Sequence, residues 1–201
     1  CNINNIRSMK HTKIIRLVSL VVSVFCSRCS YKTLVEKQES VSSQWAHLQN
    51  SYPRRADLVP NLLATVKGYA AHEQGTLTAV TEARSKVSQI NLNVDQLTEE
   101  NMQKFQAAQG ELSSALNRLM AVREAYPDLK ANQNFMALQD ELAGTENRIS
   151  TERNRFNEIV RDYNQYIRQF PRVIYAGWFG FKQKAYFEAD AGSQTAPRVE
   201  F

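Results

Sequence analysis

His72 and Glu73 are neighbours, and a histidine followed by a glutamate can begin a zinc-binding pattern. That pattern needs a second histidine four residues after the first, so that both imidazoles face one metal ion from a helix. Position 76 is Thr76, and the chain's other histidines, His11 and His47, lie elsewhere in the sequence. The pair therefore predicts a polar patch on a helix, and we expect neither a metal site nor a cofactor.

Glu73 and Glu152 occupy positions where helical periodicity otherwise places apolar residues, so we expect both carboxylates to face inward. Two inward carboxylates could be a general acid and base, or half of a di-metal site built from Glu and Glu-x-x-His. The motif is absent, because Thr76 and Arg155 stand three residues later. A buried carboxylate must be paired or neutralised, which favours an interhelical polar network over catalysis. The predicted network comprises Arg54, Arg55, Asp57, Glu73, Arg84, Arg148 and Glu152.

Arg54 and Arg55 follow Pro53 directly and precede Asp57. One interpretation is a docking or anion site, where two bases meet the start of a helix. The other is a pair of structural arginines that fix a bend between two helices, with Asp57 as the N-cap. The sequence favours the second interpretation. It also contains no nucleophile elbow, phosphate-binding loop or dinucleotide fingerprint, so we predict that the protein is not an enzyme.

The composition favours helices that could position these side chains. The 201 residues include only seven glycines and five prolines, and 43% are hydrophobic. Apolar residues recur at alternating three- and four-residue steps in four stretches. We expect helices at about residues 31–52, ended by Pro53; at about 57–87, with an irregular step near Gly75; at about 98–126, capped by Thr98; and from within 128–134 to Phe170, ended by Pro171.

A long helix with one apolar face must bury that face against other helices. The connections at residues 53–56 and 127–130 are short, which favours antiparallel neighbours. The sequence therefore predicts an all-α fold, an elongated antiparallel up-and-down bundle of about four long helices over residues 31–172. The last helix should be roughly 35–40 residues, or about 55 Å, long.

Residues 1–30 have the pattern of a targeting leader. Met9 is the expected translation start, and basic residues precede an apolar run at residues 17–25. This run is about half of the ~20 residues that a spanning helix needs. Lipid attachment at Cys26 or Cys29, an uncleaved signal anchor, and cleavage with release remain open. Bases ahead of the run favour a cytoplasmic N-terminus and an exported body.

The net charge of +5 comes from this leader. Its first 28 residues hold five bases and no acid, which leaves 20 bases and 20 acids in the rest of the chain. A neutral body lacks the basic footprint that phosphates require, so no nucleic-acid partner is predicted. All three cysteines lie in the leader, so no disulfide framework is expected in the body.

Residues 173–201 lose helical periodicity and are expected to form an irregular, aromatic tail. Its aromatic side chains could insert at a membrane interface beside nearby lysines, dock a partner protein, or fold back onto the end of the bundle. The candidate contact residues are Trp178, Phe179, Phe181, Tyr186 and Phe187.

Nine blocks along the chain resemble the LemA family. They are residues 44–45, 52–62, 66–73, 80–84, 109–116, 126–131, 144–149, 177–181 and 186–189, and the similarity is collinear over essentially all of 31–201. Two positions depart from the family pattern: Pro53 stands where the family has Gln, and Arg28 before Cys29 weakens the usual tether.

The resemblance implies a membrane-attached helical bundle without an established enzymatic activity. Such proteins are often encoded near integral-membrane metallopeptidases and other envelope proteins. We therefore expect a non-catalytic, envelope-tethered scaffold or interaction protein, whose partners are the membrane and an envelope protein or another copy of itself. Membrane-surface binding or remodelling through the aromatic tail is the alternative, and an enzyme with a site in the bundle core is a third. No small-molecule substrate is predicted.

Overall fold

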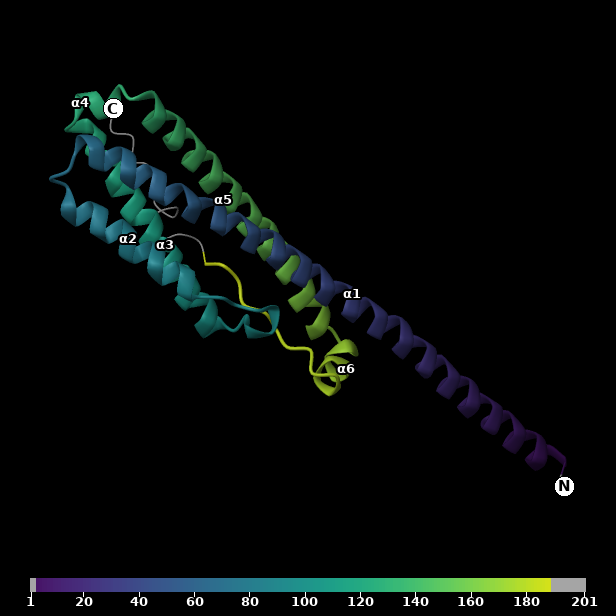
Figure 1. The fold of residues 1–201 in the computed structure, drawn as a ribbon. Helices are drawn as coiled ribbons and strands as arrows, with labels where there is room; N and C mark the ends of the chain where they lie inside the picture. The colour runs from purple at the N-terminus through teal and green to yellow at the C-terminus, as the bar shows by residue number, and fades with distance from the viewer. Residues whose placement is uncertain (1–2, 189–201) are drawn as a thin grey trace, which may run out of the picture. The chain divides into compact units, whose positions relative to one another are not determined.

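The computed structural model describes residues 3–188, and it describes side chains from residue 31 onward. This part of the chain is helical and contains no strand, which confirms the predicted all-α fold (Figure 1). The elements are α1 (Ile3–Tyr69), α2 (Gln74–Gln89), the 3₁₀ helix η1 (Val94–Gln96), α3 (Glu99–Ala121), the 3₁₀ helix η2 (Val122–Glu124), α4 (Pro127–Lys130), α5 (Gln133–Arg168) and α6 (Arg172–Trp178).

These elements divide into two compact units. Unit 1 combines the chain up to Ser40 with Asp162–Gln183, and unit 2 combines Val41–Arg161 with the chain from Lys184 onward. The helices α1 and α5 each contribute to both units.

The helix break expected at Pro53 does not occur, and that prediction was wrong. Helix α1 continues through Pro53 and Pro60 and ends at Tyr69. A proline inside a helix removes a backbone donor and costs ~3 kcal/mol or more. The burial of apolar side chains before and after the prolines offsets this cost, because each fully buried apolar side chain stabilises the fold by about 1.5–3 kcal/mol. The buried residues of α1 near the prolines are Trp45, Leu48, Tyr52, Leu58, Val59 and Leu62.

The turn lies instead at residues 70–73, where the expected 57–87 helix divides into the end of α1 and the separate helix α2. The Glu73 amide donates to the Ala70 carbonyl at 3.1 Å and closes this turn. The irregular step near Gly75 in the apolar pattern marks the first turn of α2.

The expected cap of α3 is present. The Thr98 hydroxyl accepts a hydrogen bond from the Asn101 amide at 3.4 Å, and Glu99 and Glu100 occupy the first turn. The helix ends at Ala121, earlier than expected, and η2 and α4 occupy the following segment. Helix α5 has 36 residues, within the expected range.

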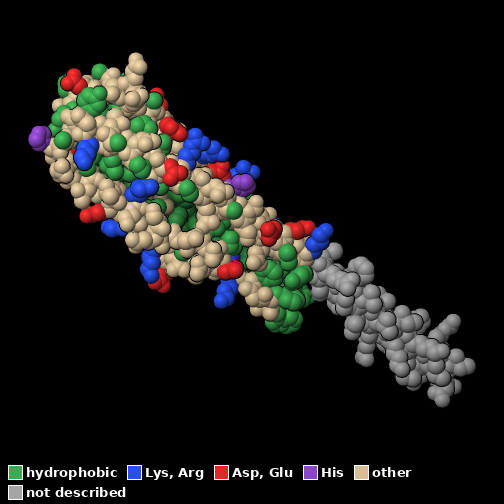
Figure 2. Space-filling view, in the orientation of Figure 1, with side chains coloured by type: hydrophobic (Ala, Val, Ile, Leu, Met, Phe, Trp, Pro, Cys, Tyr) green, Lys and Arg blue, Asp and Glu red, His purple; other side chains and the backbone are tan. Residues whose placement is uncertain are grey.

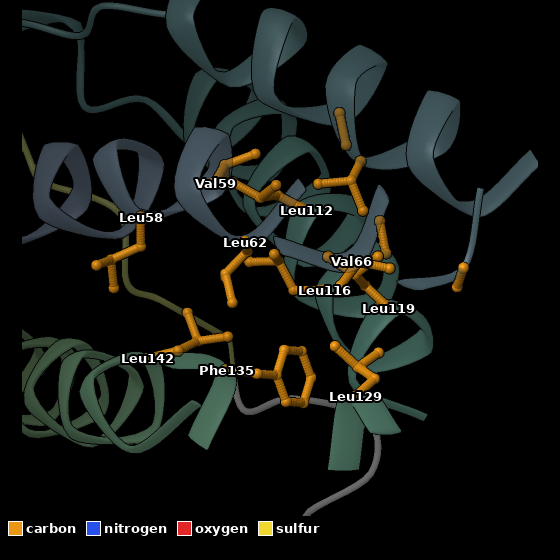
Figure 3. Close-up of a cluster of buried hydrophobic side chains, with 14 residues drawn as sticks. Leu58, Val59, Leu62, Val66, Leu112, Leu116, Leu119, Leu129, Phe135 and Leu142 are labelled. Carbon is orange, nitrogen blue, oxygen red and sulfur yellow. The ribbon is translucent and has the colours of Figure 1, made fainter. Parts of the chain in front are cut away.

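In unit 2, the part of α1 after residue 41, α2, α3 and the part of α5 before residue 161 form an up-and-down four-helix bundle. Helices α1 and α5 run in opposite directions, because Gln44 of α1 bonds to Glu152 of α5, whereas Arg54, later in α1, bonds to Glu141, earlier in α5. Figure 3 shows the side chains that fill one part of its interior. They come from α1, α2, α3, α4 and α5 and include Leu62, Val66, Val80, Leu112, Leu116, Leu119, Leu129, Phe135 and Leu142.

The C-terminal segment differs from the expected irregular tail. Residues Arg172–Trp178 form α6, and Gly180, with φ of +76°, follows its end. Residues 179–188 have no helix or strand. In unit 2, the Ala185 amide donates to the Leu97 carbonyl at 3.2 Å, and Lys184 Nζ donates to the Val94 carbonyl at 2.8 Å.

The leader predictions fall largely beyond what the structure describes. Its backbone is helical from Ile3, but Met9, Cys26 and Cys29 lie outside the residues with described side chains. Within the described part of the chain, no helix has the length and apolar character needed to cross a membrane.

Candidate functional site

Arg55 is the central polar residue of unit 2. The continuous α1 helix turns it into the bundle between Tyr52 and Val59, and only 1% of its surface is exposed. Its Nη1 donates to Ser113 Oγ at 2.8 Å and to Glu146 Oε1 at 2.9 Å. Its Nη2 donates to the side chain of Gln109.

The arrangement around Arg55 joins three helices. Gln109 and Ser113 lie on α3, Glu146 lies on α5, and Arg55 lies on α1. Charge-assisted hydrogen bonds to a planar guanidinium require defined partner positions, so the cluster fixes the register of the three helices. Among the described residues, Arg55 Nε is a buried nitrogen without a hydrogen-bond partner. The cluster can hold charge and position helices, and within it the Ser113 hydroxyl also donates to Glu146 Oε1 at 3.5 Å.

The other predicted network residues occupy separate positions. Arg54 forms an exposed salt bridge with Glu141 at 3.3 Å, and Arg84 Nε donates to the Ala56 carbonyl at 3.0 Å. Asp57 lies inside α1 with its side chain exposed, so it does not cap a helix, and Arg148 is also exposed.

The two glutamates expected to face inward are only half-buried and lie in different places. Glu152 Oε2 accepts a hydrogen bond from Gln44 Nε2 at 2.6 Å. Glu73 precedes α2 and accepts from the Tyr126 hydroxyl at 3.3 Å. Burial raises the pKa of Tyr126, and the Glu73 carboxylate raises it further. The structure therefore does not bring Glu73 and Glu152 together as an acid–base pair.

A second cluster in unit 2 surrounds Trp45. Its indole nitrogen donates to the Leu92 carbonyl at 2.8 Å, and its ring lies 5.4–6.1 Å from those of Phe105, Phe156 and Phe187. Phe187 is 4% exposed, and its backbone amide donates to Asn157 Oδ1 at 2.8 Å. This part of the C-terminal segment folds back onto the bundle, one of the three outcomes considered for the tail.

Tyr52 extends this cluster toward Arg55. Its hydroxyl accepts from Arg153 Nε at 3.0 Å, and its ring lies 5.1 Å from that of Phe105. Burial raises the pKa of Tyr52, while the Arg153 and Arg55 charges oppose the rise. The phenol therefore stays neutral at physiological pH and acts as a structural hydrogen-bond acceptor.

The remaining tail candidates lie mostly at the surface. Trp178 is 77% exposed and Phe179 is 58% exposed; Tyr186 is also exposed, whereas Phe181 is partly buried. In unit 1, Tyr31 of α1 contacts Phe179 and Phe181 with ring centroids 5.0 and 6.3 Å apart. The predicted contact residues thus separate into the buried Phe187 and an exposed group around α6.

An open groove of about 960 Å³ lies between α3 and α5 in unit 2. It is lined by small and polar residues, including Gly110, Ser114, Asn117 and Ser150, and by the Arg55 partners Ser113 and Glu146. Within the described side chains, no three histidine, cysteine, aspartate or glutamate residues gather in an arrangement that could hold a metal ion. This groove was not predictable from the sequence, because no periodic pattern reveals where two helices leave a gap.

Comparisons with known proteins find relatives that cover most of this chain. Magnetosome protein MamQ 2 of Paramagnetospirillum magneticum is 25% identical over 199 residues, covering 90% of this chain and 73% of that protein. Magnetosome protein MamQ of Magnetospirillum gryphiswaldense is 25% identical over 198 residues with the same coverage. Protein LemA of Metamycoplasma hominis is 26% identical over 145 residues, covering 72% of this chain and 59% of that protein.

The model of the LemA family matches residues 44–201. This range includes the Arg55 cluster, the Trp45 cluster and α6. Because the match covers most of the chain, this protein belongs to the LemA family.

Proposed function

We propose that this protein is a non-catalytic interaction protein of the cell envelope, attached to a membrane by the N-terminal part of α1. The observation that carries the proposal is the continuity of α1 from Ile3 to Tyr69. One helix contains the apolar run at residues 17–25 and, further along, the central core residues Trp45 and Arg55 of unit 2. A membrane anchor on this helix therefore tethers the bundle directly.

The interior of unit 2 supports a binding role. Among its largest buried side chains, Trp45 packs against Phe156, and Phe135 belongs to a cluster of buried apolar residues from the other helices. The buried Arg55 bonds to partners on two other helices. A core organised in this way stabilises a scaffold, whose outer surface would then make the contacts with other molecules.

The relatives are consistent with such a role. The MamQ proteins are named for a cell structure, the magnetosome, and their names mention no reaction. We infer for this chain a comparable place in an assembly, with an envelope protein or a second copy as partner. Bases ahead of the apolar run favour an exported bundle.

The tether can be tested with the full chain in a bacterial host. Arginines at Val21 and Val24 each cost about 2.5–3.5 kcal/mol if they must enter the hydrocarbon region. We expect Val21→Arg/Val24→Arg to move the protein from the alkaline-resistant membrane fraction to the soluble fraction. The control is Val35→Arg, which changes an exposed position of α1 and should leave the protein in the membrane fraction. Unchanged membrane retention of the double variant would contradict a tether through this run.

Two further measurements separate the alternatives. Cys26→Ser and Cys29→Ser variants should retain membrane attachment if α1 itself is the anchor, and should lose it if a lipid on either cysteine is the anchor. Metal analysis of the purified chain should show no stoichiometric transition metal. A bound metal at one equivalent would support the enzyme alternative and contradict the proposal.

A second candidate function is membrane-surface binding or remodelling through the C-terminal aromatic segment. The exposure of Trp178 and Phe179 favours it. Electron microscopy of vesicles incubated with the full chain or with a chain ending at residue 172 tests it, because it measures vesicle deformation separately from attachment through α1. Equal vesicle deformation by both chains would remove remodelling from consideration.

A further inference from the structure

Helix α6 in unit 1 exposes its apolar face. Val173, Ile174 and Trp178 fall within an arc of roughly 140° at 3.6 residues per turn, and all three are exposed. Ala176 on the other side of the helix is buried. The apolar face of a surface helix normally packs against the protein interior. The exposed apolar face of α6 is therefore suited to bind another apolar surface.

Two neighbouring aromatic residues enlarge this face. Phe170, two residues before α6, is 82% exposed, and Phe179, immediately after it, is 58% exposed. Figure 2, in the orientation of Figure 1, shows a continuous area of hydrophobic side chains over α6. We call Phe170, Val173, Ile174, Trp178 and Phe179 the α6 face. Soluble proteins rarely leave such apolar areas exposed unless they bind something there.

The charged residues that flank α6 along the sequence are of one sign. Between residues 163 and 187 the sequence carries Arg168, Arg172, Lys182 and Lys184 and no acid. Arg168 and Lys182 are exposed in unit 1. An apolar face containing tryptophan and bordered by bases is typical of segments that lie in the interface of an anionic membrane.

The α6 face contacts α1 a short distance beyond the apolar run at residues 17–25. Phe179 contacts Tyr31, whose position on α1 is six residues, or about 9 Å of helix, beyond the end of the run at residue 25. Aromatic belts occupy the headgroup level just outside the hydrocarbon region. If residues 17–25 enter the bilayer, Tyr31 and the α6 face are at the depth where such a belt lies.

We propose that the α6 face is a second membrane contact, which lies in the headgroup region of the bilayer that holds α1 and prefers anionic lipid. This inference rests on the proposed tether. The apolar side chains lie among the upper acyl chains, while Arg168 and Lys182 meet lipid phosphates. The continuity with the apolar run favours a lipid surface over a protein groove as the occupant.

The two tryptophans of the chain allow a direct test. Trp45 is 1% exposed within unit 2, whereas Trp178 is 77% exposed. The full chain is reconstituted into phosphatidylcholine vesicles with and without phosphatidylglycerol, and the Trp178 signal is the difference between the wild type and Trp178→Phe. We expect Trp178 emission at shorter wavelength, quenching by lipids brominated near the headgroup, and protection from acrylamide, all stronger with phosphatidylglycerol.

Matched variants sharpen the result. Ile174→Asp should abolish the lipid quenching of Trp178, whereas Met136→Asp, at an exposed apolar position of unit 2, should leave it unchanged. Arg168→Gln/Lys182→Gln should remove the preference for phosphatidylglycerol. Flotation of the same samples reports the tether independently.

The outcomes are distinguishable. In one outcome, the chain floats with the vesicles while Trp178 remains accessible to acrylamide and is not quenched by the brominated lipids. This result would support the tether and contradict the second membrane contact. A chain that does not float contradicts both. Protection of Trp178 that rises with protein density in the vesicles, without lipid quenching, would assign the α6 face to a second copy and overturn the lipid assignment.

Discussion

The two tryptophans of the chain differ in burial and in contacts between the two units. In unit 2, Trp45 is enclosed by three phenylalanines and its indole donates to the Leu92 carbonyl. In unit 1, Trp178 lies on a short helix, and most of its surface is exposed. The comparison indicates that aromatic residues of unit 2 stabilise the bundle, whereas those of the α6 face are available for binding.

The arginines and phenylalanines repeat this contrast. Arg55 is buried and bonds to α3 and α5, whereas Arg168 is exposed beside the α6 face. Phe187 packs into unit 2, whereas Phe179, eight residues earlier, is exposed. Residue type therefore does not separate the buried structural positions of this chain from the exposed positions that we propose for binding; their surroundings do.

The largest expected effect is on the free energy of unfolding of unit 2. Trp45→Ala removes a fully buried ring and leaves the Leu92 carbonyl without its donor, so we expect a loss of about 4 kcal/mol. Trp178→Ala should change the free energy by less than about 0.5 kcal/mol. Urea unfolding of both purified full chains, followed by circular dichroism, measures the difference. Equal losses would remove the distinction between the two units.

Arg55→Ala should cost about 3 kcal/mol, because it leaves the buried Gln109 and the Glu146 carboxylate without their cation. Arg54→Ala, next to it in the chain but in an exposed salt bridge, should cost less than about 1 kcal/mol. Arg55→Met should recover part of the loss by filling the space. The same urea titrations test this, and equal effects of the two alanine variants would contradict a central role for Arg55.

Phe187→Ala should destabilise unit 2 by about 2–3 kcal/mol, since the ring contacts Trp45, Phe105 and Phe156. Phe179→Ala should cost about 1 kcal/mol or less, mainly through the lost edge contact with Tyr31. Thermal unfolding of the two variants provides the measurement. A larger loss for Phe179 would show that the α6 face is part of a core.

Tyr163 gives unit 1 a pH dependence. Its hydroxyl donates to the Lys182 carbonyl at 3.0 Å, and burial raises its pKa from 10.0 to about 12. Because the folded chain holds this proton more tightly than the unfolded chain, the stabilisation is complete below pH 10 and is lost as pH rises to about 12. We expect a loss on the order of 2 kcal/mol, which Tyr163→Phe removes. Identical stability curves for both chains between pH 9 and 12 would contradict this assignment.

Much of the fold follows from local pattern. The Thr98 cap, the length of α5 and the all-α class were predictable because capping and apolar periodicity act over neighbouring turns. The break expected at Pro53 was wrong because tertiary burial outweighed the proline penalty. The same error placed Arg55 at a bend, whereas a continuous three- and four-residue spacing through Tyr52, Arg55 and Val59 places it inward on one helix.

The candidate site was less predictable. Gln109, Ser113 and Glu146 carry no motif, and only the packing of α3 and α5 against α1 brings them to Arg55. The return of Phe187 to Trp45 depends on contacts between residues more than a hundred positions apart. Helix α6 is seven residues long, too short for periodicity to separate it from an irregular tail.

Hydrogen–deuterium exchange of the full chain reconstituted in vesicles tests the separation of roles most directly, because it reads both units in one sample. We predict that Ile174→Asp accelerates exchange in peptides from residues 170–181 and leaves peptides from 41–69 and 133–161 unchanged. Equal exchange of 170–181 in the wild type and the variant, or faster exchange in the core of unit 2, would contradict it.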